Sequence, residues 1–339
     1  MFDITAFGEL LIDYTPAGKS PAGMDLFEQN PGGAPANVLA CASSLGSRTA
    51  FLGKIGADMQ GQFLRNTLNA AGVNTDGLIS DENWFTTLAF VSLSEGGERS
   101  FSFARKPGAD TMIRREELDL SIIRNSRIFH FGSLSLTDNP SRDTTNFALG
   151  EAKKAGCLIS YDPNFRPLLW KSRDLAIEQM RSVLPFVDII KLSDEESELL
   201  TGHSGPRKAA EHLIGAGIQI VAVTLGKAGA LVAGRSGCCR VTGFRVDAVD
   251  TTGAGDAFWG AFLYSIDRLG SAEGCGDIPK RKTLPGEIGI SQLAEITRFA
   301  NAAAAHCVTK RGAIPSMPRL NDIEKILRSS EEQGSSLPV

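Results

Sequence analysis

The chain has 339 residues, of which 42% are hydrophobic and 22% charged, and its formal net charge is −4. Such a composition is ordinary for a globular protein whose core needs neither disulfides nor a structural metal. The densest basic run is KRK at 280–282, and a solvated loop explains it better than a nucleic-acid site. No apolar run approaches the ~18 residues that span a bilayer, and the first residues lack the basic region of a signal peptide. We therefore expect no nucleic-acid or membrane partner, and reduced cysteines in a cytoplasmic protein.

Short β-rich runs alternate with helical patterns along most of the chain. Strands are predicted at Ile4–Ile12, Thr49–Ile55, Arg127–Phe131, Leu158–Tyr161, Asp188–Lys191 and Ile218–Thr224. Helices are predicted between them at Ala34–Leu45, Gly61–Ala71, Arg142–Ala155, Asp174–Leu184 and Arg207–Gly215. This alternation predicts βαβ units with right-handed crossovers and a mostly parallel sheet covered by helices on both faces. Ligands of such sheets bind beyond the carboxyl ends of the strands.

One stretch interrupts the alternation. Thr86–Leu93 and Arg99–Arg105 read as two strands joined by a Gly-rich, charged turn at 94–98. A lone hairpin is marginal in water and must pack on something. It is either an edge extension of the main sheet or, as we favour, part of a small β lid (12–30 and 86–110) that closes over a site. The remainder of 1–329 forms the single domain that carries the lid, 271–286 is a surface loop, and 330–339 is a disordered tail.

The segment DTTGAGD at 250–256 follows a β-rich run and opens a helix. Gly253, Ala254 and Gly255 are small enough for backbone N–H groups to approach an anion, which the helix N-terminus also favours. This cradle suits a phosphoryl group in transfer, and Asp256 beside it would accept a proton from an alcohol. Alternatively, Asp256 only complements the helix dipole. Phe258 stands where a dinucleotide fingerprint needs glycine, so a nicotinamide site is disfavoured. No Walker loop occurs either, so a kinase built on this segment would lack one.

A second Gly-rich segment, PGGAPAN at 31–37, also opens a helix. Gly32 and Gly33 permit close approach to a ligand, while Asn37 offers both a donor and an acceptor. Together with Asp13, they form a polar set able to hold vicinal hydroxyls. The alternative is that Asp13 caps a turn and Asn37 caps the helix.

These segments resemble the PfkB (ribokinase-like) carbohydrate kinase family over nearly the whole chain. Two family signatures occur in order, at 32–46 and 250–263, and further segments are most similar to fructokinases: GELLID (8–13), GERSFSF (97–103), YDPNFRPLLW (161–170) and KLSDEE (191–196). The resemblance implies a three-layer α/β/α domain with a mostly parallel central sheet and a small β lid. It implies a kinase that uses ATP to phosphorylate a primary hydroxyl of a sugar. The favoured substrate is D-fructose, which would give fructose 6-phosphate. Kinases of 2-keto-3-deoxygluconate or aminoimidazole riboside remain alternatives, and a catalytically silent sugar-binding protein would lack the base or the anion hole.

Residue by residue, the resemblance makes Asp256 the catalytic base and Gly253, Ala254 and Gly255 the anion hole. At the sugar or the transferring phosphate it places Asp13, Gly32, Gly33, Asn37, Arg105, Asn164 and Arg166. At the nucleotide it places Lys191, Ser193, Glu196, Thr224, Gly226, Gly229 and Asn301, with Glu196 organising Mg²⁺ through water. Ser193 departs from the asparagine usual in the family.

A K⁺ site beside the anion hole would use Asp250, Thr252, Cys307, Lys310, Gly312 and Ser316, again by resemblance. Alternatives are surface salt bridges for Arg105 and Arg166, and a helix N-cap for Asn301. His130 is expected to be a satisfied core histidine. The resemblance also implies a homodimer formed through the lid, which would cover apolar strand surface.

Overall fold

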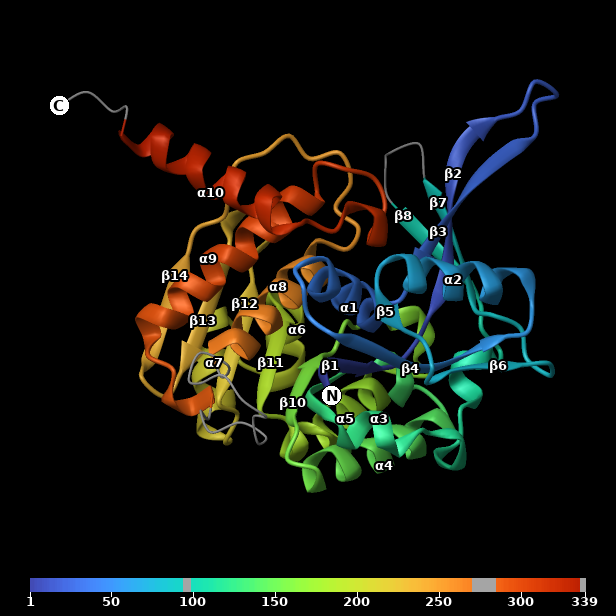
Figure 1. The fold of residues 1–339 in the computed structure, drawn as a ribbon, viewed down its shortest axis with the longest axis horizontal. Helices are drawn as coiled ribbons and strands as arrows, with labels where there is room; N and C mark the ends of the chain where they lie inside the picture. Colours follow the sequence, from blue (N-terminus) through green and yellow to red (C-terminus); the bar gives the residue numbers. More distant parts are fainter. Residues whose placement is uncertain (94–98, 270–284, 336–339) are drawn as a thin grey trace.

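The structure is a computed structural model that describes residues 1–93, 99–269 and 285–335. A ten-stranded sheet forms its middle layer (Figure 1). From one edge to the other the strands are β14 (Gly237–Val241), β13 (Ala230–Gly234), β12 (Ile220–Thr224), β11 (Ile189–Ser193), β10 (Leu158–Asp162), β9 (Ser126–Gly132), β1 (Phe2–Phe7), β4 (Thr49–Gly56) and β5 (Val73–Asn74), and β6 (Leu78–Asp81) also pairs with β4. Only the pairs β12–β13 and β13–β14 are antiparallel. The predicted mostly parallel sheet is confirmed.

Helices cover both faces of this sheet. One face packs against α1 (Ala34–Ser44), α2 (Met59–Ala70), α8 (Ala254–Leu269), α9 (Ile290–Cys307) and α10 (Leu320–Ser335). The other packs against α3 (Leu120–Arg124), α4 (Ser141–Lys154), α5 (Arg173–Ser182), α6 (Asp194–Thr201) and α7 (Pro206–Gly215). Successive strand residues enter opposite cores, as Ile128 and Phe129 do on β9. Burial on both faces explains why the strands read as continuous apolar runs.

The lid is a separate four-stranded sheet in the order β3-β2-β7-β8. It consists of β2 (Leu11–Lys19), β3 (Asp25–Gly32), β7 (Leu88–Leu93) and β8 (Arg99–Ala104). The arm formed by β2 and β3 projects from the body (Figure 1). The lid predicted from 12–30 and from the hairpin is thereby confirmed, while the turn at 94–98 lies outside the described residues.

Two predicted boundaries are wrong. The run Ile4–Ile12 is not one strand, because its two ends pair with different sheets: Gly8 N–H donates to Leu52 of β4, whereas Ile12 N–H donates to Thr87 beside β7. The tail predicted to be disordered from 330 is helical through Ser335, where α10 ends, and 336–339 lie outside the described residues. Most of the predicted loop 271–286 also lies outside them. In the ranges that the structure describes, no helix is both long and apolar enough to cross a membrane.

Candidate active site

A cleft of about 720 Å³ lies where the carboxyl ends of the central strands meet the lid. Twelve of the residues predicted from the sequence line it: Asp13, Gly33, Asn37, Asn164, Arg166, Lys191, Asp250, Thr252, Gly253, Gly255, Asp256 and Gly312. The other predicted residues do not line it: Gly32, Arg105, Ser193, Glu196, Thr224, Gly226, Gly229, Ala254, Asn301, Cys307, Lys310 and Ser316. The cleft therefore gathers residues of the two Gly-rich segments, although these segments are far apart in the sequence.

Asp256 stands half-buried in the first turn of α8. Asn37 lies within α1 and does not cap that helix; its Nδ2 donates to Asp256 Oδ2 at 2.8 Å. Burial raises the pKa of Asp256 to about 6, the charge of Asp162 acts in the same direction, and Lys191, Asn37 and Arg166 oppose it. A carboxylate with such a pKa is ionised at neutral pH yet basic enough to take a proton from an alcohol in a transition state.

Lys191 and Asp162 form a buried ion pair beneath this turn. Asp162 ends β10 and Lys191 lies within the neighbouring parallel strand β11, and Lys191 Nζ lies 2.8 Å from Asp162 Oδ2. Burial lowers the pKa of Lys191, but the carboxylates of Asp162, Glu196 and Asp256 outweigh it and leave that pKa above its ordinary value. Sequence reasoning missed Asp162, although its place at the carboxyl end of a predicted strand was a usable signal.

The sugar side of the cleft centres on Asp13 of β2. Burial raises the pKa of Asp13 to about 6, a shift that Arg166 opposes and Asp256 adds to. Gly33 has φ 118°, and a Cβ there would collide with the backbone carbonyl of Glu9, so this close approach requires glycine. Glu9, also missed from the sequence, lines the cleft and accepts the N–H of Ala34 at 3.1 Å. It thus fixes the start of α1 from outside the helix.

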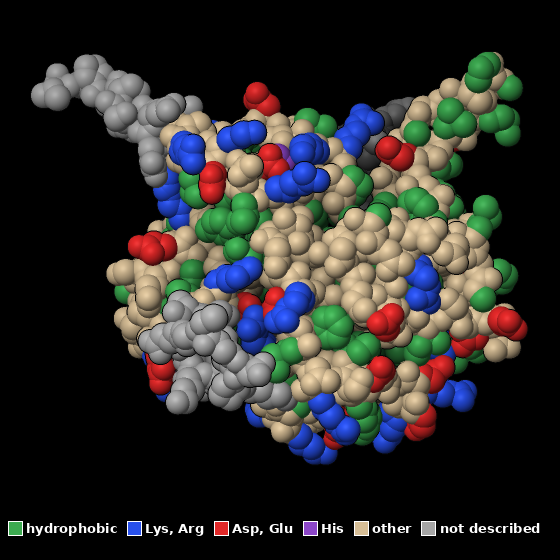
Figure 2. Space-filling view, viewed as in Figure 1, with side chains coloured by type: hydrophobic (Ala, Val, Ile, Leu, Met, Phe, Trp, Pro, Cys, Tyr) green, Lys and Arg blue, Asp and Glu red, His purple; other side chains and the backbone are tan. Residues whose placement is uncertain are grey.

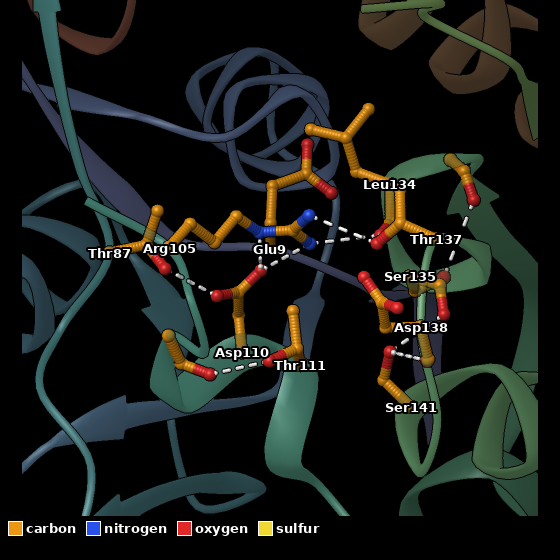
Figure 3. A network of polar contacts seen from close by, with 12 residues as sticks. Glu9, Thr87, Arg105, Asp110, Thr111, Leu134, Ser135, Thr137, Asp138 and Ser141 are labelled. Atoms are coloured by element: carbon orange, nitrogen blue, oxygen red, sulfur yellow. Dashed lines mark hydrogen bonds and ion pairs between the residues drawn. The ribbon is translucent and has the colours of Figure 1, made fainter. Parts of the chain in front are cut away.

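Arg105 directly follows β8 and is held in a buried network (Figure 3). Its guanidinium binds Asp110 through Nε at 2.8 Å and Nη2 at 2.6 Å, and both side chains are only 2% exposed. Nη1 donates to Thr137 Oγ1 at 3.0 Å and Nη2 to the Leu134 carbonyl at 2.9 Å. The alternative of a surface salt bridge is wrong, because the ion pair is buried. In this arrangement the arginine ties the lid to the main domain, and contact with a sugar or phosphate stays a prediction.

Apart from Asn301, the predicted nucleotide residues lie on β11 and β12 or in the segments that follow these strands. Ser193 caps α6, and its N–H donates to Glu196 Oε2 at 2.8 Å, which completes a capping box. Glu196 Oε1 accepts the Phe165 N–H at 2.6 Å. Asn301 is not a helix N-cap: it lies inside α9 and donates to the Val241 and Thr242 carbonyls. Thr224 ends β12, and Gly226 and Gly229 flank the turn after it.

Five of the six residues predicted for K⁺ interlock beside α8. Asp250 accepts hydrogen bonds from Thr252 and from the Gly312 N–H at 3.0 Å. The Cys307 thiol lies 3.6 Å from the Thr252 carbonyl and 3.0 Å from Ser316 Oγ. The sixth residue, Lys310, joins them through its backbone N–H, which donates to the Cys307 carbonyl.

His130 is fully buried and pairs through Nδ1 with Ser160 Oγ at 3.0 Å, away from the cleft lining. Trp259 Nε1 donates to the same Ser160 hydroxyl at 2.9 Å. Burial lowers the pKa of His130 to about 3, so this histidine is neutral. It lies in the core, as predicted, but it is not fully satisfied, because its Nε2 finds no hydrogen-bond partner among the described residues.

Comparisons with known proteins cover nearly the whole chain. The profile described as pfkB family carbohydrate kinase matches residues 1–320. Fructokinase-2 of Zea mays is 41% identical over 327 residues, which are 96% of this chain and 93% of the maize protein. Fructokinase from Xylella fastidiosa, solved with bound ATP, gives a TM-score of 0.83 at 33% identity and covers 97% of this chain and 99% of its own. Fructokinase from Vibrio cholerae O395, solved with fructose, ADP and a calcium ion, gives 0.82 at 31% identity, with 96% and 99% covered.

Proposed function

The chain belongs to the pfkB family of carbohydrate kinases and is a fructokinase-like phosphotransferase, and on that premise we propose that it transfers the γ-phosphoryl group of ATP to a primary hydroxyl of D-fructose, giving fructose 6-phosphate. One observation carries the proposal: a half-buried Asp256 lines the same cleft as Asp13 and the Gly-rich turn that opens α8. The relatives named fructokinase, one of them solved with fructose and ADP, support the choice of sugar.

In this proposal Asp256 accepts the proton of the attacking hydroxyl while the first turn of α8 receives the phosphoryl oxygens. The first N–H groups of a helix have no partner inside it, and the helix dipole adds positive potential there. Asn37 holds the accepting carboxylate in place through its 2.8 Å hydrogen bond. Asp13 and Gly33 orient the sugar from the lid side, and Arg166 stands exposed at the cleft. Positioning and charge stabilisation carry most of the work in phosphoryl transfer.

For the metal that accompanies ATP, we propose Glu196 as the residue that binds it through water. Each carboxylate oxygen accepts one backbone N–H and keeps a lone pair for a water molecule. Mg²⁺, when bound with the nucleotide, would neutralise charge on the phosphoryl oxygens. For K⁺ we propose the interlocked group around Asp250 and Thr252, where carbonyl and carboxylate oxygens gather. Activity in KCl compared with NaCl at equal ionic strength tests the K⁺ proposal.

A direct assay of ADP release over a panel of sugars, with and without Asp256→Asn, tests the function. We expect fructose to be the best acceptor and Asp256→Asn to bind both substrates while kcat falls by about 10²–10⁴-fold, the usual contribution of a general base. Turnover of another sugar in place of fructose would overturn the assignment of fructose as the substrate and leave the proposed chemistry intact. Near-parental turnover by Asp256→Asn would overturn the assigned base.

We also propose a cytoplasmic homodimer that pairs the outer faces of two lids. Phe27 and Phe90 are 46% and 38% exposed there, and Tyr14 stacks on Phe90 with ring centroids 5.2 Å apart. Figure 2 shows hydrophobic side chains along the projecting arm. Exposed apolar strand surface is a liability that pairing removes. Sedimentation should give a dimer for the parent protein and a monomer for Phe27→Asp; a parental monomer contradicts the proposal.

A further inference from the structure

Asp162 is an acidic residue of the site region that the proposed mechanism does not use. Its side chain is 1% exposed at the end of β10, and Oδ2 binds Lys191 Nζ at 2.8 Å. Oδ1 is buried and finds no hydrogen-bond partner within the part of the chain that the structure describes. A buried ion pair is weak evidence for stability, because desolvation offsets most of the attraction. The pair therefore calls for a reason beyond packing.

The position of Lys191 supplies that reason. A Cβ added to Gly255 would lie 3.0 Å from Lys191 Nζ, so the ammonium lies directly against the first turn of α8. Lys191 also lines the cleft, whereas Asp162 does not. The carboxylate thus stands on the protein side of the ammonium and the cleft on the other. A lysine has a flexible stem with several rotamers, and a fixed partner behind it selects one.

We propose that Asp162 is a positioning residue for phosphoryl transfer: it holds the Lys191 ammonium against the first turn of α8, where that charge faces both Asp256 and the incoming phosphoryl group. The inference rests on the proposed function. Preorganised charge aimed at developing negative charge is among the largest contributions to such catalysis. Held in place by Asp162, the ammonium needs no reorganisation when the phosphoryl group arrives.

The same geometry makes the two residues act on Asp256 with opposite signs. Asp162 raises the pKa of Asp256 and Lys191 lowers it, from the neighbouring strands β10 and β11. The other groups that face Asp256 are Asn37 and Cys41 on α1, Asp13 on β2, Arg166 after β10 and Cys307 on α9. None of these changes in variants of the pair. Any shift of the acidic limb of the rate profile therefore reports Asp162 or Lys191.

The experiment compares Asp162→Asn, Lys191→Met and the double variant. For each, kcat/KM for the sugar is measured at saturating MgATP from about pH 5 to pH 9, a range that brackets the acidic limb of the pH–rate profile. A base works only when ionised, so the rate falls as pH drops through its pKa. Asp162→Asn should lower kcat about tenfold or more, as loss of a charged hydrogen bond does, and move the acidic midpoint to lower pH. Lys191→Met should move it to higher pH, and the double variant should fall between the single ones.

Asp267→Asn is the matched control, because Asp267 also lies in a buried ion pair, with Arg127 at 2.6 Å, beside the amino end of β9. It should lose stability without moving the midpoint. If Asp162→Asn folds poorly, the double variant still tests the proposal, since it leaves no unpaired buried charge. Its acidic midpoint should lie at lower pH than that of Lys191→Met. Midpoints that stay fixed, or that move the same way in both single variants, overturn the proposal. If the parent protein released no ADP with any sugar of the panel, the proposed function itself would fail.

Discussion

Replacing Arg105 by methionine separates its observed structural contacts from a role at the substrate. The change leaves Asp110 buried with the Thr87 hydroxyl as its only side-chain partner among the described residues, and it removes the bonds to Thr137 and Leu134 (Figure 3). Taking one partner from a buried ion pair costs about 3–5 kcal/mol, because the remaining charge stays desolvated. That is a large fraction of the 5–15 kcal/mol by which folded proteins are typically stable. We therefore expect a marked loss in the free energy of unfolding.

Urea unfolding of Arg105→Met, of Asp110→Asn and of the double variant measures this loss. The double variant should recover part of it, since no unpaired charge remains. Arg166→Met is the control: Arg166 is exposed and lines the cleft, so its free energy of unfolding should change by no more than about 0.5 kcal/mol while sugar turnover falls. An Arg105→Met protein with an unchanged urea midpoint and a hundredfold lower kcat would refute the reasoning and place this guanidinium at the substrate.

Three further outcomes follow from the site. The kcat/KM of the parent protein should fall as pH is lowered through about 6, and Asn37→Ala should move that midpoint upward in the pH–rate profile, since the lost hydrogen bond favours ionised Asp256. Gly33→Ala should lower the free energy of unfolding, measured in urea, by about 1–3 kcal/mol and raise KM for the sugar, because φ 118° and the Glu9 carbonyl leave no room for a side chain. Glu196→Gln should raise the Mg²⁺ concentration needed for half-maximal rate; an unchanged Mg²⁺ titration contradicts the assigned role.

The sequence predicted the elements that depend on local pattern and missed those that depend on distant contacts. Alternating strands and helices predicted the three layers, and the hairpin predicted the lid, because period and turn residues are local signals. The break between β1 and β2 was invisible, since it follows from a change of pairing partner and not from a change of composition. The burial of Arg105 was equally hidden, because it depends on Leu134 and Thr137, which are brought close only by the fold.

Within the site, motif residues were predictable and their supports were not. Asp256 and Asp13 lie in Gly-rich or strand-end contexts that indicate chemistry by themselves. Glu9 and Asp162 act through partners on other elements, Ala34 and Lys191, so their roles cannot be inferred from spacing along the chain alone. Asn37 was predicted for the sugar, and its contact with Asp256 became visible only when α1 and α8 were packed together.

The contact between Asn37 and Asp256 joins two parts of the catalytic cycle. β3 ends at Gly32 and α1 begins at Ala34, so the lid strand runs directly into the helix that holds the base. The Glu9 carboxylate stabilises that junction by accepting a hydrogen bond from the Ala34 N–H. In the proposed mechanism, a lid strand that closes on the sugar would act on the segment that holds Asp256 through Asn37. Sugar binding would then align the base, which would favour proton abstraction from a bound sugar over abstraction from water.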